Sequence, residues 1–592
     1  MNLQNDKELT GYPSIDKPWL KYYSEEAKYA ADNPQKCSIY QYIYSANKNN
    51  PSDIAIEYFG AKITYSEMFQ SIDCVADALY AYGVRSGDFV TICLPNVPEV
   101  IYIVYACNKI GAVANMIDPR TNSERILKHT NIVNSVLFIT IADICDQRIN
   151  CIADKICTKN ILVVSAADSA TSPIVRLKYM FTKLDGSPKY MAFKEFVKKY
   201  QDQAIAEISY IKDTAAVMVY TSGTTGTAKG VLLSNEGIIA SSLQLISALT
   251  SREAIRFLAI IPFFSSYGFV DGMNATLGNK MTITLIPQYK PSNYTKLILK
   301  HKPNVIISVP KLWEDMAYTL KNKRVNLSYI VYPISGGDKI TAASVESINN
   351  CFFNHGSKAK LLIGYGLSEF GAAISITIPN MEFEAGSVGA IMPIANIKII
   401  NPETNEELSY EENGEICINA QSMMLGYYGN VDMDKISFKD INGVLFYRTG
   451  DKGYVSKSGQ LHIVDRYKRA MMRPDGHTVH AMPIEEVLMS RDMVRACAVV
   501  GLKLRQGSGV IPTAFIVLNE FNGDFKNIVA ELDLYSKQKL PDRDRAIAYV
   551  AIEKIPYTSN GKVNYSELER FYIDEVNAVI TDFTFVKRNL TK

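Results

Sequence analysis

The chain has 592 residues, of which 47% are hydrophobic and 21% charged, and its formal net charge is +2. A chain of this length exceeds one compact core and predicts at least two domains. The nearly balanced charge gives no polybasic face, so nucleic acid is not a predicted partner. The longest apolar stretch, residues 257–270, is shorter than the roughly 20 apolar residues of a spanning helix, which predicts no integral membrane segment. The N-terminus lacks a signal-peptide pattern and the ten cysteines lack metal spacing, so we expect a cytoplasmic protein.

Taken in chain order, residues 1–35 are polar and aromatic, with several X-Pro breaks, and predict an extended arm. From Ser38 onward, amphipathic helical patterns alternate with short apolar runs, which is typical of open α/β sheets. The expected helices are 66–80 and 98–110, and the expected strands are 89–94, 136–140 and 161–164. Residues 166–203 interrupt this rhythm with a polar, Lys- and Tyr-rich stretch, which predicts a surface excursion.

Residues 220–231 read Tyr-Thr-Ser-Gly-Thr-Thr-Gly-Thr-Ala-Lys-Gly-Val. A β-branched run, 217–220, leads in as a strand, and a helical pattern with Ser234 or Asn235 as its cap follows. Glycines allow a ligand to approach the backbone, successive N–H groups form an anion-binding concavity, and the lysine adds positive charge. The spacing excludes a Walker A loop. The stretch therefore predicts a phosphate-binding loop between a strand and a helix.

Further motifs follow at the ends of predicted strands. Buried runs at 305–309 and 329–332 precede the turn Ser335-Gly336-Gly337-Asp338, and residues 361–363 precede Gly364-Tyr365-Gly366-Leu367-Ser368-Glu369. Ligands of open α/β sheets bind outside the carboxyl ends of strands, and a carboxylate such as Glu369 suits a hard cation that bridges phosphates. In residues 447–451, Asp451 offers two acceptor oxygens that suit a vicinal diol.

The C-terminal part is set off by a charged segment. Short strand patterns between residues 386 and 428 predict a small β-rich subdomain, and residues 464–469 turn strongly charged between apolar segments, as linkers do. A helix at 483–488 and strands at 496–500 and 514–517 predict a small terminal α/β domain. It ends in the run 555–563, Ile-Pro-Tyr-Thr-Ser-Asn-Gly-Lys-Val.

Together and in this order, these motifs resemble those of the adenylate-forming superfamily, closest in type to the acyl-CoA synthetases; luciferases and peptide-synthetase adenylation domains also belong to it. The resemblance spans roughly residues 40–570. It implies an α/β fold: a large N-terminal domain of layered α/β sheets with a small β-rich subdomain, and a small, mobile C-terminal α+β domain. The expected division is an N-terminal arm at 1–35, an adenylation domain at 36–466 and a C-terminal domain at 467–592.

The resemblance also implies roles for individual residues. Lys562, Glu369 and Thr221 are the expected catalytic residues, with Glu369 as the Mg²⁺ ligand, Lys468 as the hinge and Gly476 in the thiol tunnel. Tyr365 is expected to stack on adenine, while Asp451 and Arg466 reach the ribose. The expected nucleotide-binding residues are Thr221, Ser222, Gly223, Thr224, Thr225, Gly226, Lys229, Gly336, Gly364, Tyr365, Gly366, Ser368, Asp451 and Arg466.

For the acyl pocket, we expect an aromatic and glycine-rich lining from Phe264, Phe269, Gly337, Phe370 and Gly371. Three positions depart from the family pattern: Ala228 replaces a proline, Ser265 a histidine and Ser368 a threonine. Amino-acid-activating relatives carry an aspartate directly after the phenylalanine at the position of Phe264. Because a buried ammonium without a carboxylate is costly, Ser265 disfavours an amino acid substrate.

The implied reaction activates a fatty or aryl carboxylic acid with ATP and Mg²⁺, releases pyrophosphate and transfers the acyl group to CoA. Three alternatives stay open on the sequence. The acceptor could be the phosphopantetheine of an acyl carrier protein, the adenylate could feed a luciferase-like oxygenation, or the chain could be a non-catalytic nucleotide-binding regulator. The joint presence of Lys562, Glu369 and Asp451 speaks against the last.

Overall fold

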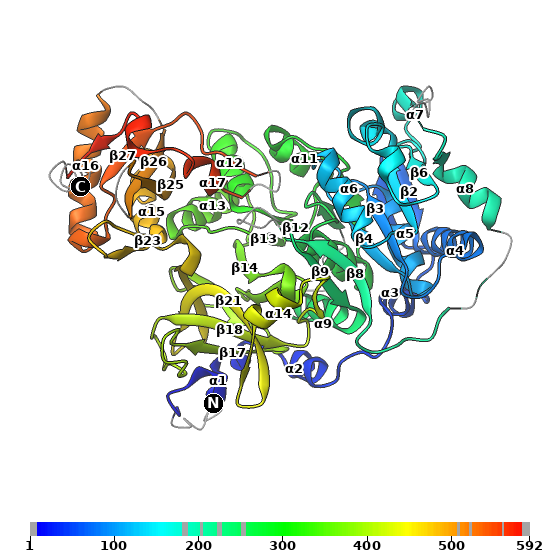
Figure 1. Cartoon of the computed structure of the whole chain (residues 1–592), viewed down its shortest axis with the longest axis horizontal. Helices are drawn as coiled ribbons and strands as arrows, with labels where there is room; N and C mark the ends of the chain where they lie inside the picture. The colour runs from blue at the N-terminus through cyan, green and yellow to red at the C-terminus, as the bar shows by residue number, and fades with distance from the viewer. Residues whose placement is uncertain are drawn as a thin grey trace.

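A computed structural model describes residues 9–179, 187–201, 205, 207–221, 228–249, 256–379, 381–505, 509–519, 524–558 and 562–582. In Figure 1, α/β layers make up one side of the molecule, a β-rich part lies below them, and the C-terminal residues form a separate lobe. The predicted α/β class is confirmed.

The first sheet holds eight strands of the described chain and is mainly parallel. Its core strands are buried along their length, as expected for parallel strands covered on both faces. Helix α5 (Pro98–Lys109), buried on almost every side, packs against α4 (Tyr65–Tyr82) and α3 (Ile39–Asn47). In sheet order the strands are β19 (Gly426–Tyr427), β9 (Gly230–Ser234), β8 (Ala215–Tyr220), β4 (Val113–Met116), β3 (Phe89–Cys93), β5 (Leu137–Ile141), β6 (Ile161–Val164) and β7 (Tyr190–Ala192).

The second sheet joins a parallel half to an antiparallel half. The parallel half runs β14 (Leu362–Gly366), β13 (Tyr332–Ser335), β12 (Val305–Ser308), β10 (Arg256–Ala259), β11 (Thr282–Leu285), β1 (Ile54–Tyr58), with β2 (Ala61–Thr64) antiparallel at its edge. The antiparallel half is the predicted β-rich part and contains β15 (Ala373–Ile376), β16 (Ser387–Ile391), β22 (Gln460–Arg466), β21 (Val444–Val455), β20 (Phe438–Ile441), β18 (Gly414–Ala420) and β17 (Ala395–Ile400). Strand β14 pairs with both halves, so the motif at residues 364–366 lies where they meet.

Helices cover both sheets. Helix α9 (Asn235–Ala248) packs on the π-helical segment η5 (Tyr267–Asn274) and on β15, while α12 (Pro310–Leu320) packs on α13 (Ala342–Asn354). The remaining helices of the large domain include α6 (Ser123–Asn131), α10 (Ala275–Gly278), α11 (Tyr294–His301) and α14 (Val431–Ser437). No helix among the described residues has the length and apolarity needed to cross a membrane.

The C-terminal lobe has its own sheet and its own hydrophobic clusters, built only from residues beyond Ala470. Its strands are β25 (Val494–Lys503), β26 (Val510–Leu518), β27 (Ala548–Ala551) and β28 (Val579–Ile580), with a small hairpin β23 (Met471–Met472) and β24 (Thr478–Val479) before them. Helices α15 (Ala481–Met489), α16 (Phe525–Lys539) and α17 (Tyr565–Leu568) complete the lobe. The predicted boundary at 466/467 falls at the end of β22.

Two expectations about peripheral segments were wrong. The N-terminal stretch is helical, with α1 (Pro13–Asp16), η1 (Pro18–Tyr22) and α2 (Glu25–Asp32), because proline at a first turn and a Ser24 cap favour helix. Residues 166–203 are not simply an excursion: α7 (Pro173–Tyr179) is followed by β7, which extends the first sheet, and by α8 (Phe193–Tyr200), which buries Phe193 and Phe196.

The expected strand–loop–helix order around the phosphate loop was also wrong. Residues 230–234 form β9, which pairs antiparallel with β8, and α9 begins only after it, with Ser234 as the cap. The loop therefore joins two strands of a hairpin. The reason lies in Gly230-Val231-Leu232-Leu233, whose apolar residues fill a position beside β8 and β19 instead of opening a helix.

Candidate active site

The two ends of the predicted phosphate loop are joined by hydrogen bonds. The N–H of Thr221 donates to the carbonyl of Lys229 over 3.0 Å, and the Lys229 N–H donates to Oγ1 of Thr221 over 3.4 Å. The predicted loop residues Ser222, Gly223, Thr224, Thr225 and Gly226 lie outside the described residues. The Lys229 ammonium lies 4.7 Å from the ring centroid of Tyr427. Burial lowers the pKa of Lys229, the Glu369 carboxylate raises it, and the Lys468 charge lowers it, so all three charges share one region.

Two tyrosines hold the Glu369 carboxylate in a buried position. The hydroxyls of Tyr427 and Tyr447 donate to Oε1 of Glu369 over 2.7 and 3.2 Å and lie 2.9 Å from each other. No described residue donates to the second oxygen, Oε2. A fixed carboxylate with one available oxygen is the ligand type that Mg²⁺ uses together with substrate phosphates, so Glu369 fits the predicted metal role.

A second buried carboxylate, Asp451, lies within β21 and contacts residues of β14 and β22. It is 1% exposed. The hydroxyl of Tyr365 donates to Oδ2 over 2.6 Å, and Nε of Arg466 lies 2.8 Å from Oδ1. Each of the two Asp451 oxygens can still accept a further hydrogen bond through a remaining lone pair. The structure thus brings together the three residues predicted to meet adenine and ribose.

Near these two carboxylates, the chain has glycines at positions where a side chain would come close to neighbouring atoms. A Cβ on Gly336 would lie 3.2 Å from the hydroxyl of Tyr267 and 3.3 Å from the carbonyl of Gly364. A Cβ on Gly366 would overlap the carbonyl of Ala372 at 1.9 Å, so only glycine fits there. Ser368 accepts a hydrogen bond from Ser266 over 3.2 Å.

Lys562 reaches this region from the C-terminal lobe. Its Cε lies 3.9 Å from the position of a Cβ on Gly337, which has a φ of +84°. The next residue, Val563, donates its N–H to Oδ2 of Asp338 over 3.0 Å. Burial lowers the pKa of Lys562 and Arg466 lowers it further, whereas Asp338, Glu369 and Asp451 raise it. A terminal lysine and the large-domain carboxylates therefore share one electrostatic site.

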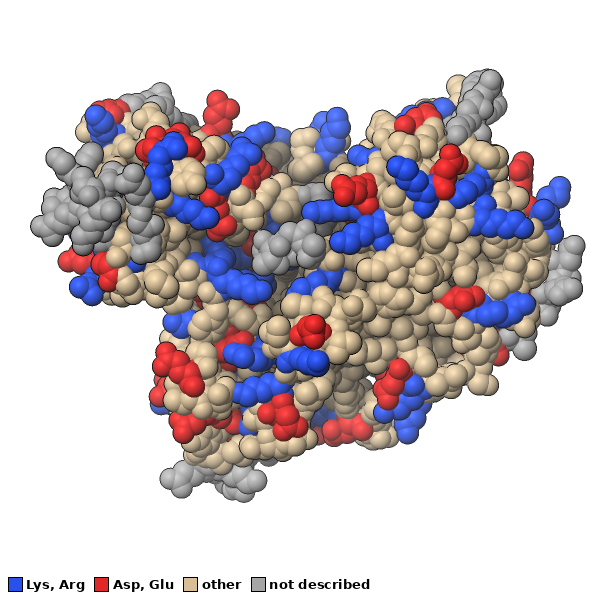
Figure 2. All heavy atoms as spheres, viewed as in Figure 1, with Lys and Arg blue, Asp and Glu red and all other residues tan. Residues whose placement is uncertain are grey.

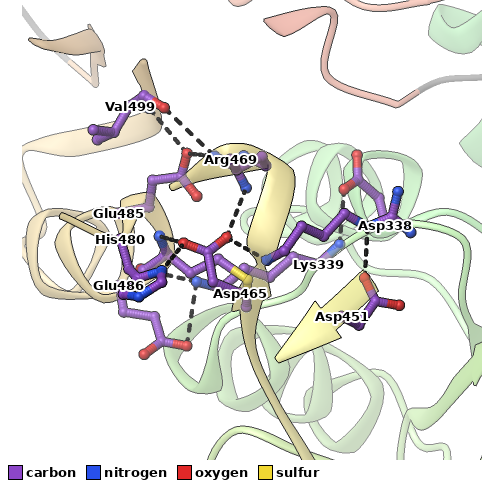
Figure 3. A network of polar contacts seen from close by, with 11 residues as sticks. Asp338, Lys339, Asp451, Asp465, Arg469, His480, Glu485, Glu486 and Val499 are labelled. Atoms are coloured by element: carbon purple, nitrogen blue, oxygen red, sulfur yellow. Dashed lines mark hydrogen bonds and ion pairs between the residues drawn. The ribbon is translucent and has the colours of Figure 1, made fainter. Parts of the chain in front are cut away.

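Figure 3 shows the polar network at the junction of the two parts. Asp465, at the end of β22, lies 3.4 Å from His480 and 4.0 Å from Arg469. Burial would raise the pKa of Asp465, but His480 and Arg469 hold it below its usual value. Arg469 also bonds Glu485 of α15 over 2.7 Å. The linker is thus fastened to the C-terminal lobe.

A second contact of Figure 3 crosses the junction. The Lys339 ammonium donates to the carbonyl of Met482 over 2.9 Å and lies 3.3 Å from Glu486. A crevice lined by both parts, including Glu314, Tyr557 and Asp338, lies beside it, so the interface is incompletely packed.

On the face drawn in Figure 2, lysine and arginine side chains border the hollow between the two parts, which favours an anionic ligand there.

Lys468 and Gly476 occupy different surroundings. Lys468 lies on the single turn η8 (Tyr467–Arg469) that follows β22, where a hinge is predicted. Gly476 lies in the turn between β23 and β24 with a φ of +80°, and no described heavy atom lies within 4 Å of its Cβ position. The structure does not bring Gly476 to the other site residues, and its predicted role in a thiol tunnel stays a prediction.

Four of the five predicted acyl-pocket residues fall into two neighbouring segments, and the fifth, Gly337, lies two residues after β13. Phe264, just before η5, and Phe269, within it, are both buried, and Phe370 and Gly371 follow β14. A Cβ on Gly371 would lie 3.6 Å from Val270, so the segments touch. Ser265 donates to the carbonyl of Pro262 and accepts the N–H of Gly268, so it stabilises the local turn.

Three residues of the site were missed by sequence reasoning. Tyr427 and Tyr447 position Glu369, and Asp338 binds the backbone beside Lys562. All three stood next to recognised glycine motifs. No spacing in the sequence indicates these pairings, because the partners lie 58, 78 and 225 residues apart.

Comparison with known families decides the class of this site. Residues 43–428 match the family described as AMP-binding enzyme, and residues 483–562 match the AMP-binding enzyme C-terminal domain. The chain belongs to the AMP-binding enzyme family. The first match covers most of the chain, including Thr221, Tyr365 and Glu369.

Curated relatives of this AMP-binding enzyme are CoA ligases. It is 29% identical over 463 residues to a probable 4-coumarate–CoA ligase of Dictyostelium discoideum, covering 77% of this chain and 81% of the relative. It is 26% identical over 557 residues to a long-chain-fatty-acid–CoA ligase of Bacillus subtilis (strain 168), covering 92% and 96%.

Solved structures share the fold. The anthranilate CoA ligase AuaEII in complex with anthranoyl-AMP matches with a TM-score of 0.78 and 18% identity, covering 91% of this chain and 98% of that one. The O-succinylbenzoate coenzyme A synthetase of Bacillus subtilis, in complex with ATP and magnesium ion, matches with a TM-score of 0.69 and 22% identity, covering 89% and 98%. At these identities the likeness establishes the fold of the AMP-binding enzyme alone.

Proposed function

We propose that this AMP-binding enzyme is an AMP-forming acid–thiol ligase that activates a fatty or aryl carboxylic acid with ATP and passes the acyl group to CoA. The observation that carries the proposal is the position of Lys562. A lysine from the C-terminal lobe lies against Gly337, within the field of Glu369, Asp451 and Arg466. The CoA ligases among its relatives support a thiol acceptor.

In the first step, a substrate carboxylate oxygen attacks the α-phosphorus of ATP. The new O–P bond forms as the bond to the bridging oxygen breaks, and pyrophosphate leaves with its electron pair. Two anions must approach each other, so positive charge at the phosphates stabilises the transition state. Lys562 supplies charge at the α-phosphate, and Lys229, at the end of the phosphate loop, supplies it near the pyrophosphate.

The nucleotide is held by groups of the large domain. Asp451 accepts hydrogen bonds from the ribose hydroxyls, and Tyr365 stacks on adenine while its own hydroxyl fixes Asp451. Arg466 neutralises part of the Asp451 charge and reaches the ribose. Glu369 would hold Mg²⁺ through Oε2, and the bound ion would neutralise charge on the phosphate oxygens.

In the second step, the thiol sulfur attacks the acyl carbon and AMP leaves through cleavage of the acyl C–O bond, while the thiol proton passes to solvent or to a base. The thiol needs the space that Lys562 occupies in the first step. Rotation of the C-terminal domain about Lys468 would clear that space and bring the turn with Gly476 to the acceptor, a hinge transition.

The test is a step-resolved assay of the full chain. Each acid of an alkyl and aryl panel is incubated with ATP and Mg²⁺, and pyrophosphate release and hydroxylamine-trapped acyl groups are measured. CoA and a phosphopantetheinylated carrier protein are then offered separately. The proposal predicts pyrophosphate release with at least one acid and thioester formation with CoA. If the enzyme forms the adenylate and acylates the carrier protein but produces no acyl-CoA, CoA is not the acceptor.

A further inference from the structure

A buried carboxylate outside the nucleotide site lacks a hydrogen-bond partner. Asp271 is 4% exposed, and its Oδ1 atom receives no hydrogen bond from any described residue. The amide of Ala373 supports the carboxyl group, but burial still raises its pKa to about 8. A buried carboxyl with an unmet oxygen costs folding free energy, so its presence calls for a functional reason.

Asp271 lies where the two segments of the predicted acyl pocket meet. It belongs to η5, about one helical turn after Tyr267, whose hydroxyl approaches Gly336. The Ala373 amide that it faces begins β15, directly after the predicted pocket residues Phe370 and Gly371. The segment is π-helical, a distortion of the helix that occurs frequently at functional sites.

We propose that Asp271 is a specificity-determining residue that selects acids carrying a hydrogen-bond donor, a hydroxyl or an amino group, on the body of the molecule. This inference rests on the proposed function. A donor placed against Oδ1 would satisfy the carboxyl, whereas a plain alkyl or aryl surface would leave it unmet, and such a site discriminates strongly against the analogue that lacks the donor.

The position of this carboxylate also revises an argument from the sequence. The sequence disfavoured an amine because Ser265 stands where relatives that bind an ammonium carry aspartate. The structure places a buried carboxyl group six residues later on the same segment, and the hydrogen bonds of Ser265 to described residues stay within its own turn. Position 265 alone therefore does not decide the polarity of the pocket.

The experiment compares matched acids. Benzoate and hexanoate are paired with their hydroxy and amino derivatives, including the 2-, 3- and 4-isomers of the aromatic ring, and kcat/KM for pyrophosphate release is measured. The wild-type enzyme should prefer the best donor-bearing acid over its plain partner by about 100-fold or more. Asp271→Leu should reduce that preference by at least about tenfold and improve the plain acids.

Two further variants distinguish the kind of donor. Asp271→Asn removes the possible charge but keeps hydrogen-bonding capacity, so it should retain a hydroxyl preference and lose an amino preference. Asp271→Ala removes the carboxyl without adding volume and replaces Asp271→Leu if the latter does not fold, as judged by its Tm. Glu99→Gln is the matched control: Glu99, on α5, is similarly buried and also has an unpartnered oxygen among the described residues, but its other oxygen accepts a hydrogen bond from Ser169.

The outcomes separate this inference from the proposed function. If pyrophosphate is released but folded Asp271→Leu or Asp271→Ala keeps the wild-type ratio of donor to plain acids, Asp271 does not select the substrate. The inference also fails if the wild-type enzyme prefers the plain acids. It fails as well if Glu99→Gln changes the ratio of donor-bearing to plain acids as much as the Asp271 variants do. If no acid on a broad panel releases pyrophosphate, the proposed function itself fails.

Discussion

The ribose end and the lysine end of the candidate site are built in different ways. Asp451 is fixed by Tyr365 of β14 and Arg466 of β22, two strands of the same sheet that precede the predicted hinge. Lys562 comes from a separate lobe, and next to it the backbone N–H of Val563 donates a hydrogen bond across the junction to Asp338. The first end is preformed, whereas the second depends on how the lobe is docked. Under the proposed function, this difference allows the lysine to serve one step and to leave for the next.

The largest expected effect is that of removing Lys562, which should slow the first reaction step and leave the second unchanged. Lys562→Ala should slow adenylate formation by about 100- to 1,000-fold, the effect typical of removing one preorganised charge from a transition state. Conversion of supplied acyl-adenylate to thioester should stay within about threefold of wild type, because under the proposed function Lys562 leaves the site before the second step. Lys554→Ala, an exposed lysine earlier in the same terminal region, is the control and should leave both steps unchanged.

The next effect concerns the carboxylate between the tyrosines. Glu369→Gln should lower adenylate formation by about 100-fold and raise the Mg²⁺ concentration needed for half-maximal rate, since a neutral amide binds a hard cation poorly. Tyr427→Phe removes one of the two hydrogen bonds that Glu369 accepts from tyrosines and should have a clearly smaller effect. Unchanged Mg²⁺ dependence in Glu369→Gln would argue against the metal role.

The preformed end should respond in both steps. Asp451→Asn should raise the KM for ATP by about tenfold or more, because hydrogen bonds to charged groups contribute about 1.5–3 kcal/mol. The same variant should bind supplied acyl-adenylate more weakly, unlike Lys562→Ala. Asp440→Asn, at an exposed residue of strand β20, is the control. A normal KM for ATP would show that Asp451 does not hold the nucleotide.

The docked end should respond only in the first step. Asp338→Ala removes the acceptor for the Val563 N–H and should slow adenylate formation by about three- to tenfold, as expected for one lost hydrogen bond. The thioester step should be unaffected. Equal slowing of both steps would instead indicate a general loss of the large domain's structure, which a lowered Tm would reveal.

The smallest effect is on the pH profile. Burial and Arg466 lower the pKa of Lys562. Its ammonium therefore loses its proton at a lower pH than that of an ordinary lysine, whose pKa is about 10.4. Adenylate formation should therefore fall as pH rises through that lowered pKa. Lys562→Arg keeps its charge and should shift the alkaline limb upward. An identical alkaline limb in Lys562→Arg would assign it to another group.

The sequence predicts the preformed end better than the docked end. The family resemblance of the motifs predicts that Tyr365, Asp451 and Lys562 share one site, and the strand-end rule for open α/β sheets independently predicts the position of Tyr365 on β14. It does not predict the Asp338 contact or the tyrosines around Glu369, since these depend on long-range packing. Local patterns also failed where tertiary pairing decided the structure, as in β9, whose apolar residues fit a strand beside β8.

The most direct test of the central claim is a double-mutant cycle between the docking contact and the lysine. Adenylate formation is measured for Asp338→Ala, Lys562→Ala and the double variant. If Asp338 acts by presenting Lys562, the double variant should be no slower than Lys562→Ala alone, so the Asp338→Ala effect disappears in that background. If the two losses multiply instead, Asp338 and Lys562 act independently and the delivery of the lysine by domain docking is contradicted.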